Sequence, residues 1–282
     1  MSLTADPRSA QIRRAAVLGS PIGHSRSPDL HLAAYRALGL EHWTYERIEC
    51  TAETLPALVD GLDESYIGLS VTMPAKVAAL RHATTVTDRA RLVGSANTLV
   101  RTDSGRWHAD CTDIDGVTGA LAELDADDLA GESVVLIGAG GTARPALAAL
   151  ASAGAGAVTV VVRDASRADG LRRLAAELRI DLDTRAFESS ADLTAVCARS
   201  SVVVSTVPAE AAGRLAASIA AAPRLLDAIY HPWPTPAAAA VADAGGRVIG
   251  GLVMLLNQAV TQVESFTGLS APRAQMAAAL AD

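Results

Sequence analysis

Short apolar runs alternate with amphipathic stretches along the first third of the chain. The pattern predicts strands at residues 15–19, 43–49 and 66–72, with helices at residues 28–38 and 52–62 between them. Strands separated by helices of roughly ten residues are typical of parallel β-α-β units. This part of the chain therefore predicts an α/β fold.

Two further strands are expected at residues 97–101 and 106–109, on either side of a turn at residues 103–105. After a helix at residues 114–124, the polar segment 125–132 is expected to mark a boundary between domains. A second β-α-β series follows it. The expected elements of that series are strands at residues 133–137, 158–162, 201–205, 225–228 and 247–249, and a helix at residues 145–152. Two further helices are expected at the end of the chain, at residues 252–266 and 271–280.

Composition and charge narrow the class of protein. A chain of 282 residues has room for two domains, and 50% hydrophobic residues with only 3% aromatic ones suit Ala-rich helices on an aliphatic sheet. No apolar run is long enough for a bilayer span, and residues 1–14 lack the apolar stretch of a secretory signal. We therefore expect a cytoplasmic protein without a membrane partner. A net charge of −7 without a basic stripe argues against nucleic acid as a partner.

Metal and disulfide chemistry are not indicated. Cys50, Cys111 and Cys197 are far apart in the sequence and form no C-x-x-C pair. His24 and His31 are seven residues apart and have no acidic residue at metal-binding spacing. We expect no metal site.

A glycine-rich turn opens the second series. The segment G-x-G-G-x-A follows the apolar strand at 133–137 and precedes a helix, as a dinucleotide-binding fingerprint does. Glycines let backbone N–H groups approach a pyrophosphate, and the helix N-terminus adds partial positive charge. A turn without a ligand is the alternative. The expected cofactor-binding residues are Gly138, Ala139, Gly140, Gly141, Thr142 and Ala143.

The residues after the next strand bear on the choice of cofactor. Arg163 and Asp164 follow the strand expected at 158–162, and Arg167 stands further on. An arginine here accommodates the 2′-phosphate of NADP, whereas an acidic residue binds the ribose 2′-hydroxyl of NAD. The two arginines favour NADP, and Asp164 keeps NAD open as a cofactor. We expect Asp164 to point to solvent.

Two serines precede the first expected helix. Ser27 stands before Pro28 and Asp29, a sequence typical of an N-cap followed by proline at the first helical position. Capping alone would explain the serines. Because a helix N-terminus favours an anion, Ser25 and Ser27 are also candidates to hold a substrate carboxylate.

A lysine follows the strand expected at 66–72. Lys76 comes at the carboxyl end of a parallel-type strand, where open α/β sheets place ligands. Asn97 and Asp113 stand at other strand ends or turns. A lysine with an aspartate partner can act as an acid/base pair, because the carboxylate orients the ammonium and keeps it charged. A surface lysine is the ordinary alternative.

Together these segments resemble the shikimate dehydrogenase family. The resemblance implies a substrate-binding and catalytic domain at residues 1–114 and 252–282, with an inserted Rossmann-type dinucleotide-binding domain at residues 115–251. The C-terminal helices would return to the first domain. The matching segments occur in the family's order and cover nearly the whole chain: residues 19–28, 68–76, 97–98, 112–113, the glycine-rich loop, 227–232, 235–236 and 251–258.

The resemblance also implies roles for individual residues. Lys76 and Asp113 would be catalytic, and Ser25 and Ser27 would bind the substrate carboxylate. The remaining implied contacts are Thr72, Asn97, Tyr230 and Gln258 for the substrate ring, and Gly251 and Met254 for the nicotinamide.

The chain departs from the family pattern at several positions. The family's cofactor run Asn-Arg-Thr reads Val162-Arg163-Asp164, and Val253 replaces a glycine. These departures leave the reaction type intact and leave the preferences for ring substituents and for NADP open. Four other positions where the family usually has Asn are Leu32, Ser70, Cys111 and Ser205.

The resemblance implies an NADP-dependent enzyme that reduces 3-dehydroshikimate to shikimate in aromatic amino acid biosynthesis, with a homodimer as a further expectation. An NAD-dependent quinate/shikimate dehydrogenase, or a paralogue acting on a related cyclic hydroxy acid, is the alternative within the class. A silent dinucleotide-binding sensor is the alternative outside it, and Lys76 with Asp113 argues against that reading. Hydrolase chemistry is disfavoured because Ser25 and Ser27 stand in no G-x-S-x-G elbow.

Overall fold

A computed structural model describes residues 12–281 and divides the chain into two compact units. The first unit ends at Thr112 and resumes at Gln258, and the second unit is Asp113–Asn257. The expectation that residues 1–14 hold no secretory signal concerns residues that mostly lie outside the described part of the chain. The described part of the chain forms no helix with the length and apolar character needed to cross a membrane.

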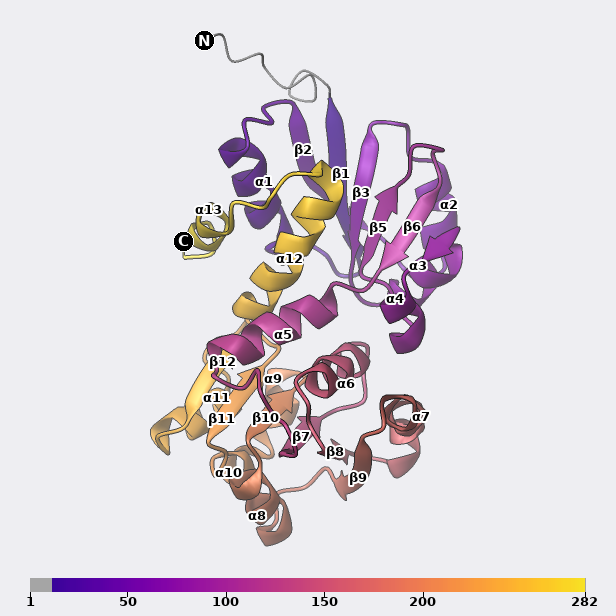
Figure 1. The fold of residues 1–282 in the computed structure, drawn as a ribbon. Coiled ribbons are helices and arrows are strands. Elements are labelled where there is room, and N and C mark those ends of the chain that lie inside the picture. The colour runs from indigo at the N-terminus through magenta and orange to yellow at the C-terminus, as the bar shows by residue number, and fades with distance from the viewer. Residues whose placement is uncertain (1–11, 282) are drawn as a thin grey trace. The chain divides into compact units, whose positions relative to one another are not determined.

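The first unit contains a six-stranded sheet with the order β2-β1-β3-β5-β6-β4 (Figure 1). The strands are β1 (Arg13–Gly19), β2 (Trp43–Glu49), β3 (Tyr66–Val71), β4 (Thr85–Val86), β5 (Thr98–Arg101) and β6 (Trp107–Asp110). The helices are α1 (Ser27–Ala37), α2 (Leu55–Asp60), α3 (Lys76–His82), α4 (Asp88–Val93), α13 (Arg273–Ala278) and the second part of α12 (Gly251–Thr267).

The strand directions in this sheet follow from the connections. β1 pairs in parallel with β2 and β3, as the β-α-β pattern predicts. β5 and β6 are joined by a tight turn in which Gly105 has φ +78°, so they run antiparallel to each other. β5 is also antiparallel to β3. The sheet is therefore mixed rather than wholly parallel.

Helices cover both faces of the first sheet. Leu55 of α2 and Ala79 of α3 are buried in one cluster with Leu69 of β3. On β3, a Cβ at Gly68 would lie 2.2 Å from the ring of Phe266 in α12, so glycine lets this helix pack directly on the strand. The carboxyl ends of β1 and β3 carry the segments that were expected to hold the substrate.

The second unit contains six parallel strands in the order β12-β11-β10-β7-β8-β9. The strands are β7 (Ser133–Ile137), β8 (Ala157–Val162), β9 (Asp181–Ala186), β10 (Val202–Ser205), β11 (Arg224–Asp227) and β12 (Arg247–Gly250). The helices are α5 (Asp113–Glu123), α6 (Ala143–Ser152), η2 (Ala165–Ala168, a 3-10 helix), α7 (Asp169–Leu178), α8 (Ala191–Arg199), α9 (Ala209–Gly213), α10 (Ala216–Ile219), α11 (Pro236–Asp243) and the first part of α12.

This strand order is that of a doubly wound dinucleotide-binding sheet. Numbered from β7, the sheet reads 6-5-4-1-2-3, and the order reverses between β7 and β10. Ligands bind at such a reversal in open α/β sheets. The fold class expected from the sequence is confirmed.

The segment 125–132, expected to mark a boundary, lies within the second unit. The reason is that α5, which precedes it, packs on elements of that unit. A Cβ at Gly119 of α5 would lie 2.1 Å from Cγ of Asn257 in α12, so the two helices are in close contact. α5 also packs against α6.

Candidate active site

Lys76 is the first residue of α3, directly after the loop that follows β3. In this loop Thr72 accepts a hydrogen bond from Ala75 N–H at 3.0 Å through its carbonyl, which turns the chain into the helix. The carbonyl of Lys76 accepts a hydrogen bond from Ala96 N–H, also at 3.0 Å. The residue after Ala96 is Asn97, so the structure brings the backbones of these two expected site residues together.

Lys76 is the only lysine in the sequence, in which Lys and Arg total 24 residues. Arginine stays protonated in proteins, whereas a lysine ammonium can give up its proton. Every other long cationic side chain of this protein is therefore unable to transfer a proton. The single exception stands at the strand end where the sequence predicts the substrate.

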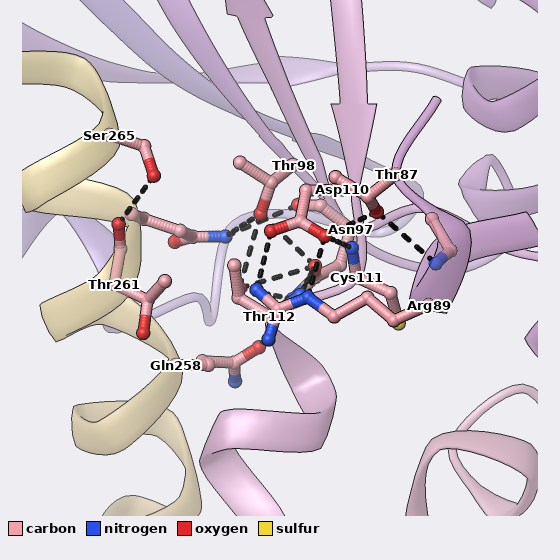
Figure 2. A network of polar contacts seen from close by, with 12 residues as sticks. Thr87, Arg89, Asn97, Thr98, Asp110, Cys111, Thr112, Gln258, Thr261 and Ser265 are labelled. Carbon is pink, nitrogen blue, oxygen red and sulfur yellow. Dashed lines mark hydrogen bonds and ion pairs between the residues drawn. The ribbon is translucent and has the colours of Figure 1, made fainter. Parts of the chain in front are cut away.

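Asn97 is 2% exposed and lies in the polar network of Figure 2. Its Nδ2 donates to Thr112 Oγ1 at 3.0 Å and to Gln258 Oε1 at 2.8 Å. Its Oδ1 accepts from Thr112 N–H at 2.7 Å and from the Thr98 hydroxyl at 3.0 Å. The network thus joins Asn97 to Gln258 and to the residue that precedes Asp113.

Gln262 extends this network and was missed by the sequence reasoning. Its Nε2 donates to the Asn97 carbonyl at 3.2 Å and to Thr98 Oγ1 at 3.0 Å. Its Oε1 accepts from the Ser70 hydroxyl at 2.8 Å. Gln262 stands four residues after Gln258 on α12, and side chains at this spacing share a helix face. That repeat of Gln is the signal that could have found it.

The hydroxyl of Ser70 also contacts a buried tyrosine. Ser70 is one of the positions where the chain departs from the family's Asn. The Tyr45 hydroxyl donates to Ser70 Oγ at 2.6 Å. The ring of His31 stacks on Tyr45 with centroids 4.0 Å apart, and its Nδ1 donates to the Ser27 carbonyl at 2.9 Å. Burial lowers the pKa of His31 to about 4. His31 is therefore neutral near pH 7 and supports the site from within the core.

Ser25 and Ser27 lie at the start of α1 and are 8% and 7% exposed. The Ser27 N–H donates to Ser25 Oγ at 3.3 Å, and Arg47 Nε donates to the Ser25 carbonyl at 2.9 Å. The expected N-cap role of Ser27 is wrong, because Arg26 takes the N-cap position and makes no capping hydrogen bond with its side chain. Ser27 already belongs to the first helical turn.

The glycine-rich turn lies between β7 and α6. Gly138 has φ +103°, and a Cβ there would come within 2.8 Å of Thr206 Oγ1. Thr206 directly follows β10, so the turn stands where the strand order reverses. A Cβ at Gly140 or Gly141 would meet nothing within 4 Å, so the backbone of this exposed part of the turn is open to approach.

Arg163, Asp164 and Arg167 are exposed after β8. Asp164 Oδ1 accepts from the N–H of Ser166 at 2.9 Å and from its hydroxyl at 2.8 Å, and it caps η2. These hydrogen bonds hold the pKa of the Asp164 carboxyl below its usual value. The Asp164 carboxylate is thus engaged by its own loop.

Tyr230 stands in the loop between β11 and α11, whose two ends are bonded together. Asp227 and Thr235 are both fully buried, and the Thr235 hydroxyl donates to Asp227 Oδ2 at 2.7 Å. Asp227 Oδ1 accepts from Ile229 N–H at 3.2 Å. Burial raises the pKa of Asp227, and the hydrogen bond from Thr235 opposes that shift. The sequence reasoning matched both residues to the family pattern but gave them no role.

Gly251 and Met254 lie in the first turn of α12. Gly251 N–H donates to the Ile229 carbonyl at 3.1 Å, and a Cβ at Gly251 would lie 2.2 Å from the Ala228 oxygen. Only glycine allows the helix to begin in contact with the loop that carries Tyr230. Met254 is 6% exposed on the same helix.

The expected site residues are divided between the two units. The first unit holds Ser25, Ser27, Thr72, Lys76, Asn97 and Gln258, and the second holds Asp113, Tyr230, Gly251, Met254, the glycine-rich turn, Arg163 and Arg167. Asp113 is 2% exposed and begins α5 directly after Thr112.

Among residues 12–281, no three or more His, Cys, Asp or Glu side chains are grouped so as to hold a metal ion.

Comparison with known proteins matches three family descriptions along the chain. Residues 17–99 match "Shikimate dehydrogenase substrate binding domain", residues 120–221 match "Shikimate / quinate 5-dehydrogenase" and residues 251–281 match "Shikimate 5'-dehydrogenase C-terminal domain". The shikimate dehydrogenase (NADP(+)) of Caulobacter vibrioides is 36% identical over 259 residues, which cover 89% of this chain and 88% of the relative.

A second curated relative is much longer than this chain. The pentafunctional AROM polypeptide of Saccharomyces cerevisiae is 34% identical over 272 residues, which cover 91% of this chain and 17% of that polypeptide. Among solved structures, shikimate dehydrogenase from Mycobacterium tuberculosis matches with a TM-score of 0.89 and 56% identity, covering 95% of this chain and 99% of that chain.

The second unit has the strand order of a Rossmann-type dinucleotide-binding sheet, and the first is a further α/β unit. The chain belongs to the shikimate dehydrogenase family. The family expected from the sequence is confirmed.

Proposed function

We propose that this protein is an NADP-dependent shikimate dehydrogenase, which interconverts 3-dehydroshikimate and shikimate in aromatic amino acid biosynthesis. The observation that carries the proposal is the position of Lys76, the only lysine, at the turn after β3. The hydrogen bond from Ala96 to its carbonyl ties it to the network of Asn97 and Gln258. Membership of the family and the NADP(+)-dependent relative support the same conclusion.

The second unit would bind NADP. The N–H groups of residues 138–143 and the N-terminus of α6 would hold the pyrophosphate, because Gly140 and Gly141 leave the backbone open to approach. NADP(H) bound there would exchange a hydride with the substrate carbon. Gly251 and Met254 would lie against its nicotinamide.

Arg163 and Arg167 would hold the 2′-phosphate that distinguishes NADP from NAD. A guanidinium can bind a phosphate through paired hydrogen bonds and can also stack on an adenine. The competing residue is Asp164, whose Oδ1 already accepts two hydrogen bonds from Ser166. An engaged carboxylate favours the assignment of the ribose site to the arginines.

The first unit would bind the substrate. The hydroxyls of Ser25 and Ser27 would donate to the carboxylate at the positive end of α1. Asn97 already uses both of its amide hydrogens within the protein, so a ring hydroxyl bound there would replace the bond to Gln258 or to Thr112. The ring contacts in this proposal are Thr72, Asn97 and Gln258 of this unit, with Tyr230 from the second unit.

Lys76 would supply the proton for the reaction. In the direction of reduction its ammonium donates a proton to the alkoxide that forms at C3, and in the reverse direction the neutral amine accepts the hydroxyl proton. The Asp113 carboxylate would orient the ammonium. Thr112 precedes Asp113 and donates a hydrogen bond to Asn97, which restrains the backbone that carries the Asp113 carboxylate.

The proposal has further parts that rest on the family resemblance. Residues 1–114 and 252–282 would form the substrate-binding domain, and residues 115–251 the dinucleotide-binding domain. The protein would be cytoplasmic and form a homodimer, which size-exclusion chromatography with light scattering tests directly. A monomer at micromolar concentration would contradict the dimer.

A spectrophotometric assay tests the function. Reduction of NADP and of NAD is followed with shikimate and with quinate, and Lys76→Met from the same purification serves as the control for contaminating activity. We expect the highest kcat/KM for shikimate with NADP and none above background for the variant. Higher kcat/KM with quinate and NAD would favour the alternative enzyme, and no turnover with any pair despite cofactor binding would favour a silent sensor.

A further inference from the structure

Asp110 ends β6, three residues before Asp113. Its Oδ1 accepts hydrogen bonds from Thr87 Oγ1 at 2.7 Å, from Arg89 Nε at 2.7 Å and from Cys111 N–H at 2.8 Å. Its Oδ2 accepts from Arg89 Nη2. Figure 2 shows these groups converging on the carboxylate. Asp110 therefore links α4 to the segment that leads to Asp113.

The bonds to Asp110 fix its orientation. The Arg89 guanidinium meets the carboxylate with two parallel N–H groups, which is the arrangement with the strictest geometry for this pair. Thr87 is held as well, because its Oγ1 accepts from Ala90 N–H at 3.2 Å as the N-cap of α4. Because both Arg89 and Thr87 bind it, the Asp110 carboxylate is a rigid acceptor for the Cys111 N–H.

Thr112, two residues after Asp110, is held by Asn97. Thr112 N–H donates to Asn97 Oδ1 at 2.7 Å, and Thr112 Oγ1 accepts from Asn97 Nδ2 at 3.0 Å. Cys111 and Thr112 are both fully buried. The backbone just before α5 is thus bonded at two successive N–H groups. Because Asp113 is covalently attached to Thr112, these hydrogen bonds also fix the position of the Asp113 backbone.

We propose that Asp110, clamped by Arg89 and Thr87, is a positioning residue for the dehydrogenase reaction. It holds the Cys111–Thr112 backbone so that the Asp113 carboxylate lies where it orients Lys76. The inference rests on the proposed function, because it takes Asp113 and Lys76 as the acid/base pair. Asp110 acts through Asp113 and not on the substrate.

The same helix provides a matched control. Arg91 of α4 forms an ion pair with Asp88 at 3.0 Å, and these side chains are 67% and 103% exposed. The side chains of Arg89 and Asp110 are 32% and 14% exposed. Exposed pairs contribute about 0–1 kcal/mol to stability. Arg91→Ala therefore removes the same residue type from the same helix without touching the clamp.

The kinetic test compares Asp110→Ala, Asp110→Asn, Arg89→Ala, Arg91→Ala and Asp113→Asn, with a thermal melt for each. We expect kcat for shikimate oxidation to fall about 10- to 100-fold in Asp110→Ala and Arg89→Ala, the usual effect of a small misplacement of a catalytic group. KM should change much less. Asp110→Asn should recover part of kcat, because its Oδ1 still accepts from Cys111 N–H, and Arg91→Ala should match wild type.

A spectroscopic test reports on Lys76 itself. Because the chain has one lysine, reductive methylation with ¹³C-formaldehyde gives a single side-chain NMR signal, whose chemical shift reports on the surroundings of residue 76. We expect Asp110→Ala to move this signal in the same direction as Asp113→Asn, and Arg91→Ala to leave it unchanged.

The outcomes separate the inference from the function on which it rests. If Asp113→Asn keeps wild-type kcat, the proposed acid/base pair is wrong whatever Asp110 does. If Asp113→Asn loses kcat while folded Asp110→Ala and Arg89→Ala keep wild-type kcat and an unchanged NMR signal of residue 76, the positioning role of Asp110 is overturned. If Asp110→Ala does not fold, Asp110→Asn and Arg89→Ala decide by the same criteria.

Discussion

The hydroxyl of Thr235 donates a 2.7 Å hydrogen bond to the carboxylate of Asp227, with both side chains fully buried. The hydroxyl oxygen of Thr235 also accepts a hydrogen bond from Ala238 N–H at 3.1 Å and so caps α11. One hydroxyl thus joins the end of β11 to the start of α11. The loop between them carries Tyr230, so this pair sets the position of an expected substrate contact.

Thr235→Val should therefore be costly. The variant removes the N-cap of α11 and the hydrogen bond from Thr235 to Asp227, for a loss of about 1–4 kcal/mol in the free energy of unfolding. KM for shikimate should rise because the Tyr230 loop loses one anchor. Urea unfolding and steady-state kinetics measure both effects. Thr235→Ser keeps the hydroxyl and should restore most of each, and a fully stable Thr235→Val would contradict this account.

Ser27→Ala should raise KM for shikimate and leave the melting temperature nearly unchanged. The physical reason is that Ser27 would bind the carboxylate but does not cap α1. Ser190 is a matched control, since its hydroxyl accepts from Leu193 N–H at 3.1 Å and caps α8. Ser190→Ala should lose about 1 kcal/mol of stability with unchanged KM. Equal KM in Ser27→Ala and wild type would remove Ser27 from the substrate site.

Arg163→Ala should lower kcat/KM for NADP by about 10- to 100-fold, the worth of a hydrogen bond to a charged group. The value for NAD should stay close to that of wild type, because NAD lacks the 2′-phosphate. Asp164→Asn should change the preference little, since the Asp164 carboxylate is engaged by Ser166. A wild-type enzyme that uses NAD as well as NADP would contradict the assignment.

His31 should make the protein less stable in acid. Its pKa is about 4 in the folded state against 6.5 as the ordinary value, because burial disfavours the charged ring. Between these values the unfolded chain binds more protons, so stability falls as pH drops from 6.5 toward 4. The full loss is about 3 kcal/mol.

Urea unfolding across pH 4–7 measures this slope. His31→Gln should flatten it, while the exposed His42 provides a control, since His42→Gln should keep the wild-type slope. An identical slope in His31→Gln and wild type would show that another group carries the acid sensitivity.

How far the sequence predicts the fold depends on burial. The apolar run at residues 133–137 coincides with β7, which is a central strand buried on both faces. β9 was not expected, because Asp181–Ala186 is a polar strand at the edge of its sheet and has no hydrophobic pattern. Edge strands are recognised by their pairing, which the sequence does not display.

The candidate site shows the same limit. Lys76 and Asn97 stand in motifs that place them at strand ends, so the sequence could single them out. The clamp between Arg89 and Asp110 joins residues that are 21 positions apart, and no local pattern marks it. Gln262 and its bond to the Asn97 carbonyl depend on how α12 packs on the first sheet. Such partners follow from tertiary packing and not from spacing along the chain.

The proton transfer assigned to Lys76 is the central claim, and kcat for shikimate oxidation with NADP tests it most directly. In Lys76→Ala and Lys76→Arg we predict a loss of about 10²–10⁴-fold, with smaller changes in KM and an unaltered melting temperature. Arginine keeps the positive charge but cannot transfer the proton, so it should not rescue turnover. Wild-type kcat in either variant would contradict the mechanism and leave Lys76 as a surface lysine.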